Sequence, residues 1–340
     1  MTLRAKARKL HRDLAPSVSA CGVRIPGGGL ARLTVGERGA RVAGATRCAS
    51  PWSCPVCAPR LAALRAEALR PQVAALMASG GSAWLVTLTA RHARGDDLRG
   101  LWTRLSGAWK RVTSGRAWAD LRSRGAPQFV RGADLTFGEG AGWHPHLHVL
   151  LLLPAAHGDG AAVAAWLLDR WRSALEAEGL EALPQGLDAR RADSPEAAAA
   201  YAVKPAAVYE AGAMALKRAK GEGSGRTPFE LLQAAVAGDR RAVVLWREYV
   251  AATKGIRQTT TSRGLKLTTD DELAEADEAA GDGEVVALLS GGALCLLDGA
   301  PLAALLDAAE RSHCDALEML ARELGPPGRL WFFPREKMVV

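Results

Sequence analysis

Three histidines occupy alternating positions in the stretch GWHPHLHVLLLL, residues 142–153, and an apolar run follows them directly. A short apolar run bounded by Gly and Pro is typical of a buried strand, and side chains alternate between the two faces of a strand. His144, His146 and His148 therefore share one face. The whole chain has 7 histidines. Their concentration here favours a metal site over incidental surface residues, because imidazole is the commonest protein metal ligand.

The segment before this strand predicts its partner. Residues 128–137, QFVRGADLTF, read as a strand, and a Gly-rich loop leads from them to the histidines. In a hairpin symmetric about a loop of roughly seven residues, Asp134 lies opposite His148, and Thr136 opposite His146. Asp134 would then join two histidines as a third ligand and leave coordination positions open. A loop one residue longer or shorter would turn Asp134 to the other face.

A cysteine cluster lies near the N-terminus. Cys54 and Cys57 form a CxxC in CASPWSCPVC, which also holds Cys48. This spacing is typical of zinc, whose structural sites take four ligands in a tetrahedron. Residues 30–42 read as a short strand or a hairpin that could bring Cys21 to the other three. A redox role for the CxxC is the alternative, and the additional cysteines argue against it. The distant Cys295 and Cys314 are expected in the core.

The distribution of charge indicates a polyanionic partner. Residues 1–70 hold 13 basic and 3 acidic side chains, whereas residues 270–325 hold 2 and 14. A basic body with an acidic region favours binding to nucleic acid. The sequence predicts no signal peptide and no membrane span, because no apolar segment follows the charged N-terminus and no long apolar stretch occurs. The cytoplasm is the expected location.

Apolar periodicity surrounds the histidine strand with helices and one further strand. Residues 83–90 read as a strand, and helical spacing recurs over 60–76, 98–112, 160–178 and 229–254. The expected fold is α+β, with a central antiparallel sheet of about five strands and flanking helices. Four segments are expected: a basic arm at 1–20, a cysteine element with its helix at 21–80, the sheet domain at 81–268, and an acidic linker with a small unit at 269–340.

One of the chain's three tyrosines lies on a helix predicted to begin at Pro195 and to end at Pro205. Tyr201 and Lys204 are three residues apart and therefore neighbours on one helix face. A tyrosine oxygen can attack phosphorus, and a nearby ammonium favours the phenolate. A metal on the sheet would polarise the scissile phosphate. The combination suits phosphoryl transfer on DNA.

These ordered motifs resemble the HUH endonucleases and, more closely, the Rep family of rolling-circle plasmid replication initiators. The histidine–hydrophobic–histidine element is His146-Leu147-His148. The resemblance extends over roughly residues 20–268, through CASPWSCPVCAPRLAALRAE, VTLTARH, DLTFGEGAGWHPHLHVLLLL, AAYAVK and LWREYVAATKGIRQTTTSRGLK.

The resemblance implies a nickase and strand transferase acting at a plasmid origin. Tyr201 would stay joined to the 5′ phosphate, and the free 3′ hydroxyl would serve a polymerase. The implied metal is Mg²⁺ or Mn²⁺ at His146 and His148, with His144 close by and Asp134 where family members usually carry Glu. The zinc expected at the cysteines would be structural. The implied partners are single-stranded or origin DNA, a host helicase and a host polymerase.

Some members of the family use a Glu near the tyrosine to activate water at termination. Glu196 precedes Tyr201 by five residues, about 140° round the helix, which does not suit that role. Tyr209 is the rival nucleophile. Two other functions compete with the nickase. One is a non-catalytic zinc protein that binds DNA, and the other is a 2-His-1-carboxylate iron oxygenase, which needs no DNA.

Overall fold

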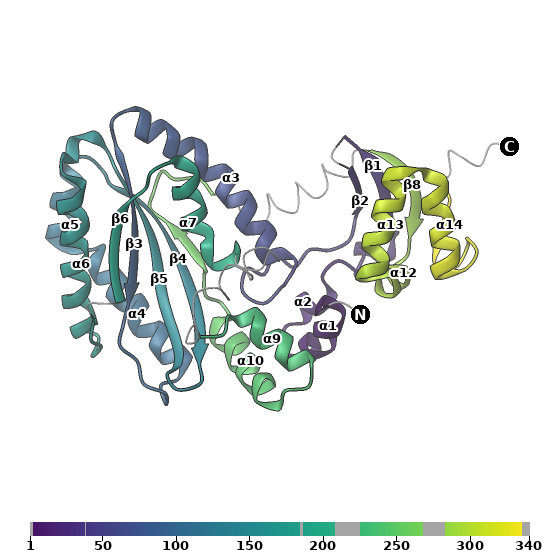
Figure 1. Cartoon of the computed structure of the whole chain (residues 1–340), viewed down its shortest axis with the longest axis horizontal. Coiled ribbons are helices and arrows are strands. Elements are labelled where there is room, and N and C mark those ends of the chain that lie inside the picture. The colour runs from purple at the N-terminus through teal and green to yellow at the C-terminus, as the bar shows by residue number, and fades with distance from the viewer. Residues whose placement is uncertain (1–2, 38, 184–185, 208–224, 268–282, 335–340) are drawn as a thin grey trace. The chain divides into compact units, whose positions relative to one another are not determined.

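The structure is a computed structural model that describes residues 3–37, 39–183, 186–207, 225–267 and 283–334 (Figure 1). The chain forms two compact units. The larger unit is Ala58–Thr268, and the smaller unit combines Met1–Cys57 with Thr269–Val340.

The larger unit is built on a five-stranded antiparallel sheet with the order β6-β3-β5-β4-β7 (Figure 1). Its strands are β3 (Ser82–Thr89), β4 (Gln128–Gly138), β5 (Gly142–Leu153), β6 (Leu187–Arg191) and β7 (Thr259–Thr261). The predicted α+β class is confirmed, and the three predicted strands are neighbours. β5 is central, and its residues from Leu147 to Leu153 are buried because helices cover both faces.

The predicted register of the β4–β5 hairpin is wrong by two residues, although the predicted face is right. Asp134 pairs with His146 rather than His148, and Thr136 pairs with His144. Pairing continues to Gly138 and Gly142, so the loop is shorter than expected and its centre lies one residue earlier. Gly142 has a φ of 80°, in the left-handed region that glycine tolerates. A shift of the strand register by an even number of residues leaves Asp134 on the histidine face.

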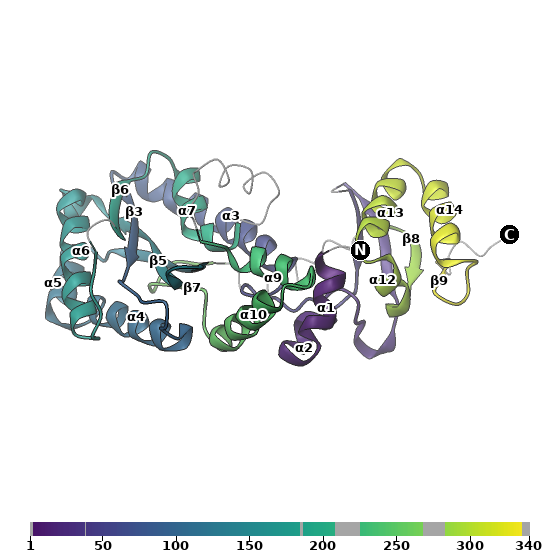
Figure 2. The same cartoon turned by 60° about the horizontal axis from the view of Figure 1, so that its bottom comes forward.

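The histidine face of the sheet is covered by α3 (Cys57–Ala78) and α7 (Pro195–Ala207). Figure 2 shows both helices on one side of the strands. Leu69 and Val73 of α3 and Ala198 and Ala202 of α7 share one buried cluster with the strands. Both helices continue through an internal proline, α3 through Pro71 and α7 through Pro205, and at Pro205 the sequence predicts the end of the helix. A proline removes one backbone donor, which packing of the flanking turns can offset.

The opposite face is covered by α4 (Leu98–Val112) and α6 (Gly160–Glu176). Trp109 of α4 packs edge-on against Phe129 of β4. Gly160 of α6 lies so close to Trp84 of β3 that a side chain at this position would clash with it. The predicted helical spacing is confirmed, because the apolar residues of α4 from Leu98 to Val112 are buried at every turn. The unit is completed by α5 (Gly115–Ser123), α9 (Pro228–Val236) and α10 (Arg240–Thr253).

The smaller unit has a four-stranded antiparallel sheet with the order β2-β1-β8-β9. Its strands are β1 (Ala31–Gly36), β2 (Gly39–Ala43), β8 (Glu284–Leu289) and β9 (Trp331–Phe332), and its C-terminal helices are α12 (Gly291–Leu297), α13 (Ala300–Arg311) and α14 (His313–Leu324). The C-terminal region is therefore not a separate unit, because β8 pairs directly with β1. The acidic linker expected before β8 lies outside the described residues up to residue 282.

Residues 1–20, expected as an arm, fold into α1 (Leu3–Leu14) and α2 (Pro16–Ala20). The Arg8 Nε atom lies 2.8 Å from Asp298 Oδ2, and both side chains are largely buried. This ion pair ties the basic N-terminal helix to the C-terminal part of the same unit. Cys295 and Cys314, expected in the core, are exposed.

No single helix among the described residues is long and apolar enough to cross a membrane. The bent pair α12 and α13 passes the same test only when taken together, and its buried apolar side chains, such as Leu294 and Leu305, are part of the core of the smaller unit.

Candidate functional site

Three side chains able to bind metal meet at the centre of the larger sheet. Asp134 of β4 lies directly opposite His146 of β5, and His148 follows two residues later on the same face. Asp134 Oδ2 lies 3.2 Å from His146 Nε2 and 3.7 Å from His148 Nε2. One donor atom from each side chain lies within 4.8 Å of the other two. This donor group could hold a metal ion.

The charge state of Asp134 suits a cation. Burial alone would raise the pKa of this carboxyl, but the charges and hydrogen bonds of His146 and His148 outweigh burial and hold the pKa well below its usual value. The carboxylate is therefore ionised at neutral pH, which is the form that binds metal.

His144 faces the same side but bonds to a different partner. Its Nδ1 atom lies 3.1 Å from Nε2 of His92, and Nδ1 of His92 lies 3.1 Å from the carbonyl oxygen of Ala141. Burial, followed by the charges of His146 and His92, lowers the pKa of His144 to about 4. His144 is therefore neutral near pH 7 and can accept or donate one hydrogen bond to His92.

Helix α7 brings Tyr201 to the edge of the donor group. The Tyr201 and His148 ring centroids are 5.0 Å apart, and the Tyr201 hydroxyl lies 2.8 Å from Thr87 Oγ1. Thr87 of β3 is the direct cross-strand neighbour of His148. Burial raises the pKa of Tyr201 to about 12, so the phenol is protonated at neutral pH. The hydroxyl and the donor group thus lie side by side on one face of the sheet.

Three other sequence predictions concern residues near Tyr201 in the sequence. Lys204 lies on α7, but its side chain is outside the described residues, as is the whole of Tyr209. Glu196 lines a separate cavity of about 270 Å³, together with Glu67 and Arg70 of α3. That position agrees with the helical angle that separates Glu196 from Tyr201.

Sequence reasoning missed several polar residues around the tyrosine and the histidines. Thr87 and His92 both lie in the stretch VTLTARH, and the period-two alternation of that strand places Thr87 on the histidine face. Asp188 of β6 lies directly opposite Thr87, and Arg190 follows on the same face. β6 has the sequence LDARR and lies at the sheet edge, so it has no apolar alternation from which it could be predicted.

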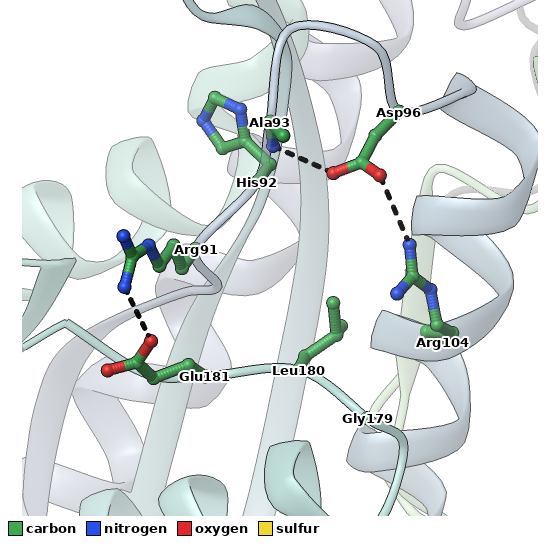
Figure 3. A pocket seen from close by; sticks show the side chains of 8 residues that line it. All are labelled: Arg91, His92, Ala93, Asp96, Arg104, Gly179, Leu180 and Glu181. Atoms are coloured by element: carbon green, nitrogen blue, oxygen red, sulfur yellow. Dashed lines mark hydrogen bonds and ion pairs between the residues drawn. The ribbon is translucent and has the colours of Figure 1, made fainter.

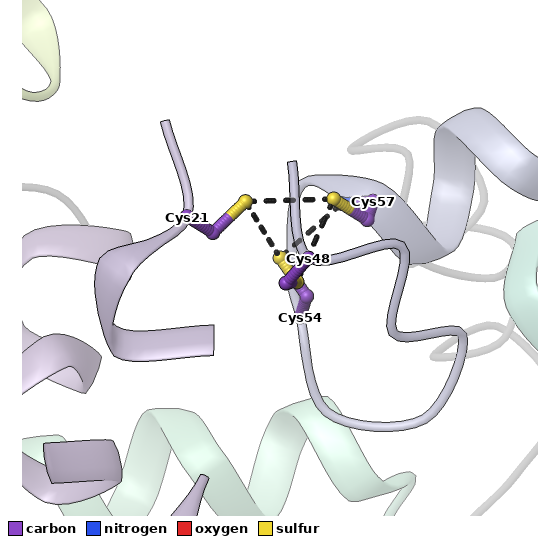
Figure 4. Close-up of side chains that lie close together, drawn as sticks. All are labelled: Cys21, Cys48, Cys54 and Cys57. Atoms are coloured by element: carbon purple, nitrogen blue, oxygen red, sulfur yellow. Dashed lines mark hydrogen bonds between the residues drawn. The ribbon is translucent and has the colours of Figure 1, made fainter. Parts of the chain in front are cut away.

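Four cysteines come together in the smaller unit at the start of α3 (Figure 4). Cys21 Sγ lies 3.5 Å from Cys57 Sγ and 3.8 Å from Cys54 Sγ, and Cys48 Sγ lies 3.7 Å from Cys57 Sγ. All four are free thiols. Contacts with the other three thiols hold the pKa of Cys21 well below its ordinary value. This group could hold a metal ion, and it includes Cys21 as predicted.

The fold and its donor groups define an α+β protein with two candidate metal centres, one of them beside a buried tyrosine. Residues 39–177 match the family model described as "Replication protein". This match, together with the first of the relatives described next, supports the Rep family of plasmid replication initiators as the family that the chain resembles. The matched segment includes Cys48, Cys54, Cys57 and all three residues of the sheet donor group, and it ends before Tyr201.

Two curated relatives come from Streptomyces. The chain is 29% identical over 306 residues to "Protein rep" of Streptomyces lividans, with 70% of this chain and 67% of that protein covered. It is 36% identical over 141 residues to "Neomycin resistance protein" of Streptomyces cyanogenus, with 34% of this chain and 32% of that protein covered. The chain thus spans about two thirds of the first relative and one third of the second. No solved structure matches the chain.

Proposed function

We propose that this replication initiator is a metal-dependent endonuclease of the HUH type, which nicks one DNA strand at a specific site and transfers it through a covalent bond to Tyr201. One observation carries the proposal. The Tyr201 ring packs edge-on against His148, a member of the donor group formed with Asp134 and His146. Its hydroxyl bonds to Thr87, the cross-strand neighbour of His148. A nucleophile next to a metal centre is the arrangement that attack on a phosphodiester requires.

His146, His148 and Asp134 would hold Mg²⁺ or Mn²⁺, with His144 as a neighbour hydrogen-bonded to His92. The bound ion would polarise the scissile phosphate and neutralise the charge that develops on its oxygens. Because the set has three donors, positions remain open for phosphate oxygens. The β4–β5 pairing holds Asp134 and the histidines in place, which fixes the donors before substrate arrives.

Tyr201 acts as the nucleophile. Its oxygen forms a bond to phosphorus, the bond from phosphorus to the 3′ oxygen breaks, and the leaving strand takes up a proton as its 3′ hydroxyl. The phenol proton departs to solvent, and Thr87 orients the phenol through the 2.8 Å hydrogen bond. Lys204, three residues later on α7, is proposed to favour the phenolate. Lys204→Ala should slow nicking without abolishing it, which initial rates of strand cleavage measure.

The cysteines are proposed to hold one structural zinc ion. A tetrahedral zinc with Zn–S bonds of about 2.3 Å has S···S edges of about 3.8 Å. The separations of 3.5, 3.7 and 3.8 Å fit that geometry. Residues 44–56 contain no helix or strand. Ordering this segment costs roughly 1–2 kcal/mol per residue, so a bound ion would stabilise it.

The free 3′ hydroxyl would prime a host polymerase after a host helicase opens the duplex, and the expected compartment is the cytoplasm. Basic side chains concentrated in residues 1–70 would supply contacts to phosphates. A donor set of two histidines and a carboxylate also fits an iron oxygenase. A covalent bond between Tyr201 and DNA is required only by the nickase, and a non-catalytic DNA-binding protein would form none.

The experiment is capture of a covalent adduct. The full chain is incubated with a library of randomised single strands and Mn²⁺, denatured in detergent, and freed of unbound DNA. Sequencing of the attached strands gives the cleaved site, and mass spectrometry gives the modified peptide. A nucleotide on the peptide that contains Tyr201 supports the proposal. If binding to single strands is tight but no strand survives denaturation with the protein, the nickase proposal fails and the non-catalytic DNA-binding protein replaces it.

A further inference from the structure

Five aromatic side chains follow one another along β5 on the histidine face. The distance between ring centroids is 5.0 Å from Tyr201 to His148, 4.8 Å from His148 to His146, 5.3 Å from His146 to His144, and 4.8 Å from His144 to His92. The middle of this series is the metal-donor group. Tyr201 is therefore at one side of the donor group, and the His144–His92 pair is at the other.

A cavity of about 470 Å³ lies beyond His92, where β3 ends (Figure 3). His92 and Ala93 line it from the segment after β3, Arg104 from α4, and Leu180 from the segment after α6. Figure 3 shows Leu180 projecting between two ion pairs. The pairs are Arg91 with Glu181 at 2.8 Å and Arg104 with Asp96 at 3.8 Å.

The geometry of in-line displacement indicates on which side of the reacting phosphorus this cavity lies. The attacking and leaving oxygens lie on opposite sides of the phosphorus during phosphoryl transfer. The phosphorus must lie at the donor group, and Tyr201 attacks from the His148 side. The 3′ oxygen therefore leaves toward His144 and His92. The nucleotide that carries this oxygen lies next to the cavity.

We propose that this cavity is the binding site for the 3′-terminal nucleotide of the leaving strand, which is also the nucleotide that returns in strand transfer. The proposal rests on the proposed function and adds the strand polarity at the site. Cavities of this volume are typical of small-molecule and nucleotide sites. A bound 3′-terminal nucleotide keeps its hydroxyl near the phosphotyrosine, so the strand is available for rejoining.

The lining has the chemistry that a single nucleobase needs. The Leu180 side chain offers an apolar surface against which a base of any identity can pack, and His92 lies at the wall of the cavity nearest His144. Arg104 and Asp96 are each about one-third exposed and their ion pair is long, so both can hydrogen-bond to a base edge. Two basic and two acidic groups balance in charge, which favours a base over a bare phosphate.

The returning strand completes a balanced reaction. The 3′ oxygen forms a bond to the phosphorus held by Tyr201, and the bond from phosphorus to the tyrosine oxygen breaks. The 3′ hydroxyl loses one proton and the Tyr201 phenolate gains one, so the step is balanced in protons. No other reactant is consumed, so binding of the terminal nucleotide in the cavity sets how efficiently the acceptor strand is used.

The test measures acceptor use by the full chain after the adduct has formed. The adduct is made with a cleaved strand identified from the library, and acceptor strands with a 3′ hydroxyl are titrated against it. One acceptor has a normal 3′-terminal base and the other has an abasic sugar there. For the unmodified chain, the half-saturating concentration of the abasic acceptor should be about tenfold higher than that of the normal acceptor, because the abasic acceptor loses one good contact.

Two variants address the cavity by different means. Arg104→Ala removes a hydrogen-bonding group, and Ala93→Phe fills the space from an exposed position without deleting a contact. Both should lose the tenfold preference for the normal base while still forming the adduct. Arg116→Ala, an exposed change of the same charge on α5, should keep the preference.

Three outcomes would overturn the proposal. The first is an unmodified chain that uses both acceptors equally. The second is a full preference in both cavity variants. The third is a response to an abasic site on the 5′ side of the phosphotyrosine instead, which would reverse the polarity. These outcomes differ from failure of the nickase itself, in which the unmodified chain forms no adduct with any strand.

Discussion

Replacing Tyr201 by Phe should separate the proposed chemistry from the fold. The change deletes one oxygen and keeps the ring, which is only 7% exposed and packs in the cluster with Leu85 and Leu150. The structural loss is the hydrogen bond to Thr87 at 2.8 Å. Such a bond contributes about 1 kcal/mol net. For a unit the size of Ala58–Thr268, that loss lowers the melting temperature by about 2–4 °C.

The chemical loss should be far larger. Without its nucleophilic oxygen, the chain should form no covalent adduct, and nicking should fall by about 10⁴-fold or more. The assays are single-turnover cleavage of a labelled strand, adduct yield on a denaturing gel, and thermal melting of the same preparation. DNA affinity should stay within about twofold, because it comes mainly from phosphate contacts with Lys and Arg.

The matched control is Tyr249→Phe. Tyr249 lies on α10, is 2% exposed, and has a pKa that burial raises well above the usual value. Its replacement also deletes a buried hydroxyl, but it should leave adduct formation intact, as should Tyr209→Phe. An adduct that persists in Tyr201→Phe, or a nucleotide found on the peptide that holds Tyr209 but not Tyr201, would refute the assignment.

The remaining predictions concern the two metal centres and one buried histidine. His148→Ala should abolish cleavage while DNA binding survives, and His144→Ala should have a milder effect; equal loss of cleavage rate in both would show that the ligand pair is wrong. Elemental analysis should find one zinc per chain, reduced in Cys48→Ser and unchanged in Cys295→Ser, and less than about half an equivalent in the fully soluble unmodified chain would count against the site. Burial of His11 lowers its pKa from 6.5 to about 4, so the neutral form is favoured by folding. The smaller unit should therefore lose stability as the pH falls from 6.5 to 4, as thermal melting measures, and His11→Gln should remove most of that pH dependence.

The amino-acid sequence was enough to predict which metal-binding side chains share one face of the sheet. Alternation in residues 142–153 places His144, His146 and His148 on one side of a central strand, because the period of a strand is two residues. The same parity keeps Asp134 with them even though the predicted pairing is two residues out of register. The CxxC motif of Cys54 and Cys57 can likewise be recognised from the spacing of the two cysteines alone.

Which of these groups meet depends on the packing of segments that are far apart in the chain. Pairing of β3 with β5 places Thr87 beside His148, and packing of α7 brings the Tyr201 hydroxyl to Thr87. The segment after β3 brings His92 to His144, and the cavity beyond is lined by residues from two stretches far apart in the chain, 91–104 and 179–181. β1 and β8 pair across more than half the sequence. Local periodicity fixes the direction in which a side chain points, whereas the position of its partner depends on how distant segments pack, and no local pattern encodes that distance.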